Sequence, residues 1–185
     1  MRQFETGIPG LIVVEPEVHG DERGYFMELW HATRYGVEGL PDRFVQANVS
    51  RSSGGVIRGL HYQYPQPQGK LVSVLEGSVF DVAADIRVGS PTFGQWAGIE
   101  LSAGNHRQLY VPAGMAHGFC VLGDSAMMVY MCTAEYNAEA DAAIAWNDPD
   151  IAVDWPRSPR RMSAKDKNAP RLSAVPEDQL PRFQT

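Results

Sequence analysis

The feature that most limits how this chain can fold is a succession of short apolar runs, each ended by a glycine- or proline-bearing turn. The runs are rich in β-branched and aromatic residues, which favour strands. Turn chemistry lies between them, as in GDERG, YPQPQG, EGS, GSPTFG, SAGN, PAG and LGDS. Strands are predicted at 10–18, 25–30, 44–50, 55–63, 70–75, 79–86, 95–101, 107–111, 117–122 and 126–133. This spacing predicts an all-β sandwich or barrel, and a jelly roll fits about ten strands best.

Helices are expected only at the periphery. A short one is predicted near His31–Val37, and further pieces are predicted in the tail beyond Pro156, which is rich in Pro, Arg and Lys. We expect this tail to wrap the barrel or to extend from it as an irregular segment. No flexible linker divides the 185 residues, so a single domain is predicted over 1–185, with the barrel at about 10–155 and the C-terminal segment at 156–185.

Charge and composition exclude several classes of function. The net charge is −6, so no positive field recruits nucleic acid or an anionic membrane, and an anionic ligand must be held by individual arginines. Arg23 in the turn 20–24 is either such a ligand for phosphate or part of a solvated cluster. No basic region precedes an apolar core at the N-terminus, and no stretch reaches the roughly 18 apolar residues of a membrane span. Cytoplasmic residence is therefore predicted, with Cys120 and Cys132 as free thiols.

The run 44–50 could present a polar face to a ligand. Strict alternation separates its apolar residues from Gln46, Asn48 and Ser50. This polar face is either an outer surface or the lining of a cavity within a small barrel, and both interpretations stay open.

Arg58 and His61 lie three residues apart, so a regular strand would point them to opposite faces. Gly59 between them is typical of a bulge, which could turn both toward one cavity. Alternatively, His61 is half-buried and Arg58 is solvated. Lys70 opens the next apolar run, and a hairpin would bring it beside His61. It is an ordinary strand-end cation or, near a histidine base, a cation that stabilises an enolate oxygen.

His117 lies in the turn-rich segment VPAGMAHGF and, together with His61, could suggest a metal site. Gln63 stands where the second histidine of a His-x-His pair would be. Two imidazoles are one ligand fewer than the three that a catalytic metal usually requires, so no metal is expected.

Tyr130 and Asp166 each have a structural and a chemical interpretation. Tyr130 shares a strand face with Met128 and Cys132, so it is either a core residue or a general acid. Asp166 is the fourth residue of SAKD, which begins at Ser163 and fits a capping box. Its carboxylate could instead orient a histidine base, as the third member of a triad does.

Over about residues 5–172 the chain resembles the dTDP-4-dehydrorhamnose 3,5-epimerases, which are built on a cupin-type jelly-roll barrel. The resemblance is carried, in order, by GDERG (20–24), VIRGLHYQ (56–63), QGKL (68–71), FDVAADIR (80–87), SPTFGQW (90–96), VPAGMAHGF (111–119) and SAKD (163–166). It implies an all-β cupin-type barrel with short peripheral helices and an irregular C-terminal tail. The implied reaction epimerises C3 and C5 of dTDP-4-dehydro-6-deoxy-D-glucose through enolates, giving dTDP-4-dehydro-L-rhamnose in dTDP-L-rhamnose biosynthesis.

The same resemblance assigns roles. His61 would be the base with Asp166 as its partner, Lys70 would stabilise the enolate, and Tyr130 would be the acid. Contacts to the nucleotide sugar would come from Arg23, Glu28, Gln46, Ala47, Asn48, Arg58, Lys70, His117, Asp141 and Lys165. Two positions depart from the family, because Ala47 sits where it often has Asp and Asp141 where Glu is expected.

The implied reaction moves only protons beside the C4 ketone, so neither a metal nor a redox cofactor is expected. The lack of a glycine-rich dinucleotide motif in the sequence agrees with this expectation. A symmetric homodimer is also implied, which would cover the edges of the N-terminal strands and could lend Arg23 across the interface.

Three alternatives remain. A mono-epimerase of a related dTDP-4-keto-6-deoxy sugar would use the same residues to invert only C3 or only C5. A metal-dependent cupin oxygenase is disfavoured by Gln63. A non-catalytic sugar-nucleotide binder is disfavoured because His61, Lys70, Tyr130 and Asp166 occur together.

Overall fold

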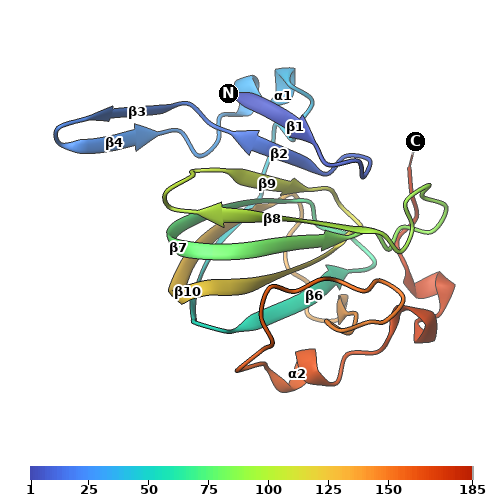
Figure 1. Ribbon diagram of the computed structural model, residues 1–185. Coiled ribbons are helices and arrows are strands. Elements are labelled where there is room, and N and C mark those ends of the chain that lie inside the picture. Colours follow the sequence, from blue (N-terminus) through green and yellow to red (C-terminus); the bar gives the residue numbers. More distant parts are fainter. Residues whose placement is uncertain (185) are drawn as a thin grey trace.

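Two long antiparallel strands, β7 and β10, form the centre of the main sheet (Figure 1). The computed structural model describes residues 1–184. β7 and β10 pair along nearly their whole length, from Ala84 opposite Ala116 to Lys70 opposite Cys132. On its other edge β10 pairs first with β6 and then with β5, while β7 pairs with β9 and then with β8. The predicted all-β jelly-roll barrel is confirmed.

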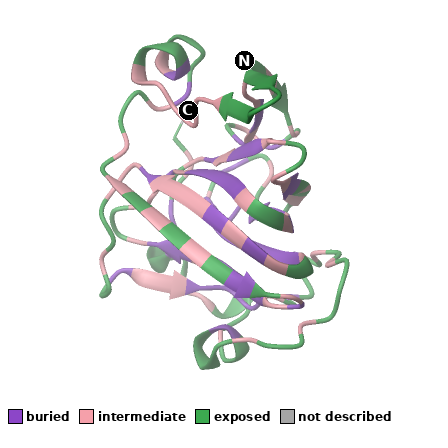
Figure 2. Cartoon of the chain, turned by 90° about the vertical axis from the view of Figure 1, so that its left-hand side faces the viewer, coloured by how far each residue is buried: buried purple, intermediate pink, exposed green. Residues whose placement is uncertain are grey.

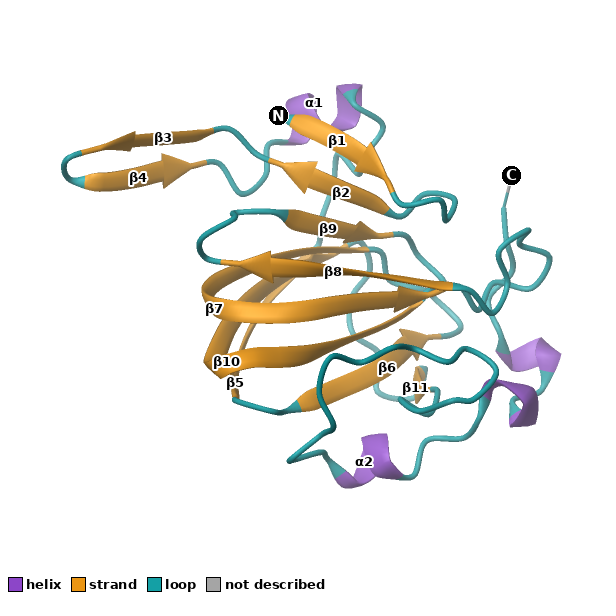
Figure 3. Ribbon diagram, viewed as in Figure 1, coloured by secondary structure: helices purple, strands orange, loops and turns teal. Residues whose placement is uncertain are grey.

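The strands are β1 (Arg2–Glu5), β2 (Ile12–Glu15), β3 (Val18–Asp21), β4 (Gly24–Met27), β5 (Gln46–Ser53), β6 (Ile57–Gln63), β7 (Lys70–Ala84), β8 (Trp96–Ser102), β9 (Gln108–Val111), β10 (Ala116–Cys132) and β11 (Asp141–Ala143). The helices are short and peripheral (Figure 3): α1 (Ala32–Val37), α2 (Ala164–Lys167), η1 (Leu172–Ala174) and η2 (Glu177–Gln179). They agree with the predicted helix near 31–37 and with the predicted pieces in the tail. No helix in residues 1–184 is long and apolar enough to cross a bilayer.

Two predicted turns do not end strands. EGS at 76–78 lies within β7, and LGDS at 122–125 lies within β10, so the separate strands predicted on either side of each turn are wrong in this respect. The register between β7 and β10 shifts between Val121 and Ala126, which is where LGDS lies. Turn-forming residues at these places therefore bend a continuous strand, because pairing with neighbouring strands resumes beyond them.

Burial alternates along the strands, as one barrel wall shows (Figure 2). The interior cluster is aliphatic and includes Val72, Val79 and Leu109. A second cluster lies beneath the C-terminal segment, where Leu172 and Leu180 pack against strand residues. Of the two courses expected for the tail, it therefore takes the wrapping one.

A buried ion pair joins the N-terminal and C-terminal segments to the sheet. Arg87 donates from Nε to Asp85 Oδ1 at 2.8 Å and from Nη2 to Asp85 Oδ2 at 2.7 Å, and Nη2 also donates to the Pro9 carbonyl at 3.0 Å. Its guanidinium lies 4.9 Å from the centre of the Phe183 ring. The side chains of Arg87 and Asp85 are 7% and 0% exposed. Such a pair is costly to break from one side, because the remaining charge stays buried.

We expect Arg87→Met to lower the free energy of unfolding by about 3–5 kcal/mol, because it leaves the Asp85 carboxylate without its cation. Arg107→Met is the matched control: Arg107 pairs with Glu15 at 2.9 Å, but its side chain is 43% exposed. That change should cost no more than about 1 kcal/mol. Urea denaturation of both variants measures the difference, and equal losses would contradict this account of the buried pair.

Candidate active site

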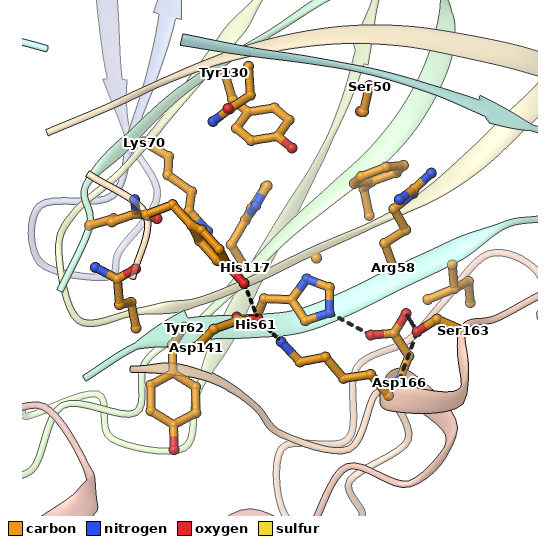
Figure 4. A pocket seen from close by; sticks show the side chains of 18 of the residues that line it. Ser50, Arg58, His61, Tyr62, Lys70, His117, Tyr130, Asp141, Ser163 and Asp166 are labelled. Atoms are coloured by element: carbon orange, nitrogen blue, oxygen red, sulfur yellow. Dashed lines mark hydrogen bonds and ion pairs between the residues drawn. The ribbon is translucent and has the colours of Figure 1, made fainter. Parts of the chain in front are cut away.

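A cavity of about 720 Å³ opens on the inward faces of β5, β6, β7 and β10, with the start of α2 at its edge (Figure 4). It is lined by ten of the predicted site residues: Gln46, Asn48, Arg58, His61, Lys70, His117, Tyr130, Asp141, Lys165 and Asp166. Three other predicted residues, Arg23, Glu28 and Ala47, do not line it.

The polar face of β5 lines the cavity, which decides between the two interpretations of 44–50. Gln46, Asn48 and Ser50 face inward. Ala47 is exposed on the opposite face, and Val49 on that face is 64% exposed. Strand alternation turns the Ala47 side chain away from the cavity of its own chain, so its contact with the substrate stays a prediction.

A bulge in β6 lets Arg58 and His61 line the same cavity, one of the two interpretations that the sequence left open. The exposures named by the other interpretation are also found, because His61 is half-buried and Arg58 is exposed. His117 of β10 lies opposite His61 and Phe119 lies opposite Arg58, so β6 carries one residue more than β10 between these pairs. Gly59 sits in the bulge with φ +116, and a Cβ there would lie 2.6 Å from the Gly118 Cα. Only glycine meets both the backbone conformation and this close approach.

His61 and Asp166 meet across 105 residues of sequence, with His61 Nε2 2.5 Å from Asp166 Oδ1 (Figure 4). Ser163 caps α2 by accepting from the Asp166 backbone N–H at 3.1 Å, and its hydroxyl donates to Asp166 Oδ2 at 2.8 Å. Burial acts to raise the pKa of Asp166, but hydrogen bonds from His61, Ser163 and the Gly59 N–H outweigh it and lower that pKa. Asp166 thus belongs to the capped first turn of α2 and is also the hydrogen-bond partner of His61.

Lys70 reaches the cavity by a different route from the predicted hairpin. β10 lies between β6 and β7 in the sheet, so the prediction that these two strands are neighbours is wrong. Lys70 nevertheless lines the same cavity as His61, because both side chains face the barrel interior. Burial lowers the pKa of the Lys70 ammonium, and the carboxylates of Asp81 and Asp141 act against this lowering.

Tyr130 lies on β10, and its side chain is directed into the cavity (Figure 4). Its strand neighbours Met128 and Cys132 on the same face are 1% exposed. Burial raises the pKa of the phenol, which therefore keeps its proton at neutral pH. A buried ring with its hydroxyl in a cavity can both pack and donate a proton.

Asp141 and Lys165 form an ion pair of 2.5 Å at the cavity, and Tyr136 donates its hydroxyl to the same Asp141 oxygen at 3.2 Å. The sequence analysis missed Tyr136, which lies in a loop without regular spacing. Its backbone N–H donates to Gln46 Oε1 at 2.8 Å, which ties this loop to β5.

His117 pairs with Asp81 at 2.8 Å, a partner that the sequence analysis also missed. Alternation along FDVAADIR puts Asp81 on the same face as Asp85 and Arg87, so nothing in the sequence indicates that it faces inward or pairs with His117. Gln63 holds two loops, donating to the Gln66 and Glu135 carbonyls at 2.6 and 3.1 Å. Within residues 1–184, no group of three His, Cys, Asp or Glu side chains could hold a metal ion.

Arg23 and Glu28 lie outside the cavity of their own chain. Arg23 occupies the turn of the β3–β4 hairpin, where it pairs with Asp21, and its side chain is 84% exposed. Glu28 pairs with Arg34 of α1. The expectation that both contact the sugar nucleotide is therefore not met within one chain.

We expect Gly59→Ala to be more destabilising than Gly89→Ala. Gly89 also has a positive φ, +85, but a Cβ there would have no neighbour within 4 Å. Gly89→Ala should therefore cost only the left-handed strain, about 1–2 kcal/mol. Gly59→Ala should cost a further 1–3 kcal/mol or so from overpacking against β10. Urea denaturation compares the two, and indistinguishable losses would mean that β10 yields freely at the bulge.

Comparison with known proteins agrees with this geometry. The family model described as dTDP-4-dehydrorhamnose 3,5-epimerase matches residues 5–174. A dTDP-4-dehydrorhamnose 3,5-epimerase of Methanothermobacter thermautotrophicus is 50% identical over 155 residues, which cover 84% of each chain. A crystal structure of dTDP-6-deoxy-D-glucose-3,5-epimerase from Legionella pneumophila, in complex with dTDP-4-keto-L-rhamnose, is 51% identical with a TM-score of 0.96, covering 100% of this chain and 99% of that one.

A structure of a 3′-monoepimerase from Streptomyces bikiniensis, in complex with dTDP-quinovose, is also similar. It is 33% identical, with a TM-score of 0.88, and covers 95% of this chain and 91% of its own. The family model and the two epimerases of about 50% identity span most of the chain, including the cavity. The chain belongs to the dTDP-4-dehydrorhamnose 3,5-epimerase family.

Proposed function

We propose that this protein epimerises C3 and C5 of dTDP-4-dehydro-6-deoxy-D-glucose, giving dTDP-4-dehydro-L-rhamnose for dTDP-L-rhamnose biosynthesis. The observation that carries the proposal is the meeting of His61, Lys70, Tyr130 and Asp166 around one cavity, in a chain of this family. C3 and C5 both flank the C4 ketone, so loss of either proton gives an enolate. Return of a proton from the opposite face inverts the carbon.

In this reaction His61 is the base. Its Nε2 is bound to Asp166, whose charge is further stabilised by Ser163 and the Gly59 N–H. This arrangement fixes the imidazole with its proton on Nε2 and leaves Nδ1 free to take a proton from the sugar. Asp166 acts through His61 and does not touch the sugar.

Lys70 and Tyr130 complete the proton transfer. The Lys70 ammonium stabilises the charge that develops on the C4 oxygen as the proton leaves, an effect that is strong in a site shielded from water. Tyr130 returns a proton to the other face. The phenol has a proton to give at neutral pH, because burial raises its pKa above the ordinary value of 10.0.

The nucleotide is held by individual cations, since the chain has a net charge of −6. Arg58 donates to Ser52 Oγ at 3.1 Å and forms no ion pair within residues 1–184, so its guanidinium is available to the diphosphate. Lys165 and His117 line the same cavity, as do Gln46 and Asn48 of the polar β5 face.

We further propose a homodimer in which the β3–β4 hairpin reaches the partner's cavity. The hairpin pairs only with itself and projects from the barrel (Figure 1). An isolated two-stranded hairpin is at best marginally stable in water. Tyr25 and Phe26 on it are 56% and 71% exposed, as expected of residues that pack against another chain. Arg23 and Glu28 would then bind the sugar nucleotide of the partner.

The reaction proposed here needs neither a metal nor a nicotinamide, and cytoplasmic residence stays a prediction. The similarity to the Streptomyces bikiniensis 3′-monoepimerase favours a second candidate, an epimerase that inverts one carbon only. The two candidates share the chemistry of each step, so they differ in which carbons exchange and invert.

The test is NMR of the protein with dTDP-4-dehydro-6-deoxy-D-glucose in deuterium oxide, with a chelator present and no nicotinamide added. Wild type should place deuterium at C3 and C5 with inversion at both. His61→Ala should lose exchange and inversion together, by about 10²–10⁴-fold. Tyr130→Phe keeps the packed ring and the base, so exchange with retained configuration should outlast inversion.

Each departure from these outcomes has a defined meaning. Exchange and inversion at a single carbon would establish the mono-epimerase in place of the double epimerase. Activity that disappears with the chelator and returns with a metal would overturn the proposed chemistry. Full epimerisation by Tyr130→Phe would mean that the phenol only packs and that another group is the acid.

Subunit complementation tests the dimer. Arg23→Ala should weaken dTDP binding measured by calorimetry, although Arg23 lies outside its own cavity; Arg58→Ala should do the same from inside. Coexpressed Arg23→Ala and His61→Ala chains should regain activity, because a mixed dimer has one cavity with both His61 and the partner's Arg23. A monomeric mass by light scattering, or unchanged affinity in Arg23→Ala, would exclude this arrangement.

A further inference from the structure

Two histidines of the cavity are direct cross-strand neighbours, and each is bound to its own carboxylate. His61 of β6 lies opposite His117 of β10. His61 Nε2 is 2.5 Å from Asp166 Oδ1, and His117 Nε2 is 2.8 Å from Asp81 Oδ1. Both imidazoles therefore keep only Nδ1 for a ligand. The proposed reaction uses one of these pairs as its base and leaves the second without a defined role.

The two carboxylates differ in how their charge is stabilised. Asp166 accepts hydrogen bonds from His61, from the Ser163 hydroxyl and from the Gly59 N–H. Asp81 is 0% exposed, and His117 is its hydrogen-bond partner through Oδ1. Its Oδ2 is buried without any hydrogen-bond partner among residues 1–184. Asp166 is thus stabilised as an anion by neutral donors, whereas Asp81 is not.

This difference assigns different charges to the two imidazoles. A buried carboxylate without neutral donors is costly unless a cation pairs with it. The ion-pair partner that the structure gives Asp81 is His117, itself 8% exposed. An Asp81 carboxylate beside a neutral His117 imidazole has a net charge of −1. One additional proton on the pair brings the net charge to zero. That extra proton leaves His117 Nδ1 protonated, as a hydrogen-bond donor.

The other charged and titratable groups around the cavity are compatible with this state. They are Lys70 of β7, Arg58, His61 and Tyr62 of β6, Tyr130 of β10, Tyr136 of the following loop, Asp141 of β11, Arg161 of the C-terminal segment, and Lys165 and Asp166 of α2. Asp141 forms an ion pair with Lys165, and Asp166 is hydrogen-bonded to His61 and Ser163. Lys70 lies close enough to Asp81 for that carboxylate to act against the lowering of the Lys70 pKa, but it forms no ion pair with Asp81 within residues 1–184. His117 is therefore the cation bonded to Asp81.

We propose that Asp81 is a positioning residue that keeps both ring nitrogens of His117 protonated, so that His117 Nδ1–H and the Lys70 ammonium together donate to the C4 oxygen of the substrate. The part concerning C4 rests on the proposed function. Hydrogen-bond donors held in place around an oxygen stabilise the negative charge that develops on it in the transition state. His61, whose carboxylate is already satisfied, remains neutral and free to act as the base. The His117–Asp81 pair thus stabilises the developing negative charge, and the His61–Asp166 pair removes the proton.

The charge assignment is tested directly by NMR of the full-length protein labelled with ¹⁵N-histidine, at neutral pH and without ligand. The chain has five histidines, so His117→Gln and His61→Gln spectra suffice to assign both rings. His117 should show two protonated ring nitrogens, and His61 should show one. An unprotonated nitrogen in His117 of the wild type would overturn the proposal, whatever the variants do.

Asp81→Asn tests whether Asp81 causes this state, because asparagine keeps the shape and removes the charge. His117 should then lose one ring proton, and kcat should fall about 10²–10³-fold, as for one lost oxyanion donor. KM should change little, because the donor acts on charge that develops in the transition state. Asp148→Asn is the control: Asp148 is 2% exposed but accepts from backbone N–H groups outside the cavity. It should leave the His117 spectrum and kcat unchanged.

The outcomes separate this proposal from the proposed function. If Asp81→Asn keeps His117 doubly protonated and kcat within a few-fold of wild type, Asp81 has no such role. If the wild type shows the expected His117 spectrum but does not turn over the dTDP sugar, the charge assignment stands and the proposed reaction fails. Should Asp81→Asn not fold, the wild-type spectrum still decides whether His117 is the charged member.

Discussion

The pairing of β7 with β10 is the constraint on which the rest of the structure depends. Lys70 and Asp81 come from β7, while His117 and Tyr130 come from β10. The outer edge of β10 then adds β6, with Arg58 and His61, and β5 with its polar face. Because backbone hydrogen bonds fix the register of neighbouring strands, they also fix which side chains meet in the cavity. The long strands therefore fix the base of the site, whereas Tyr136, Asp141, Lys165 and Asp166 come from loops and short elements at its edge.

The sequence predicted those parts of the site that depend on local geometry. Alternation separated the two faces of β5, and Gly59 indicated a bulge that could turn Arg58 and His61 toward one cavity; the structure has both features. Contacts between distant segments could not be derived in this way. The pairs His61 with Asp166 and His117 with Asp81 depend on closure of the barrel, which no local pattern encodes. The strand ends predicted at EGS and LGDS are wrong for a related reason. Turn residues only bend a strand when neighbouring strands pair with it on both sides of the bend.

Asp166 shows why a structural and a chemical role need not compete. The Ser163 hydroxyl that caps α2 also donates to the Asp166 carboxylate, so the cap and the histidine partner share one hydrogen-bonded unit. Capping requires the Ser163 hydroxyl oxygen, which accepts from the Asp166 N–H. Orienting His61 requires a buried carboxylate at Asp166 whose charge is stabilised. One short helix meets both requirements. A residue that belongs to a helix-capping motif can therefore also take part in the chemistry.

The inverted amphipathicity of β5 links the cavity to the proposed dimer. In a barrel with an apolar core, the outward face of a strand is usually the polar one. β5 turns Gln46 and Asn48 inward, while Val49 is 64% exposed, and Val45, just before the strand, is 39% exposed. Gln46 and Asn48 are hydrogen-bonded to each other, and the Tyr136 N–H donates to Gln46, so the inward face is polar and ordered. The exposed Val49 offers apolar surface that a second subunit could cover. Substrate binding and the proposed association of subunits would then use opposite faces of the same strand.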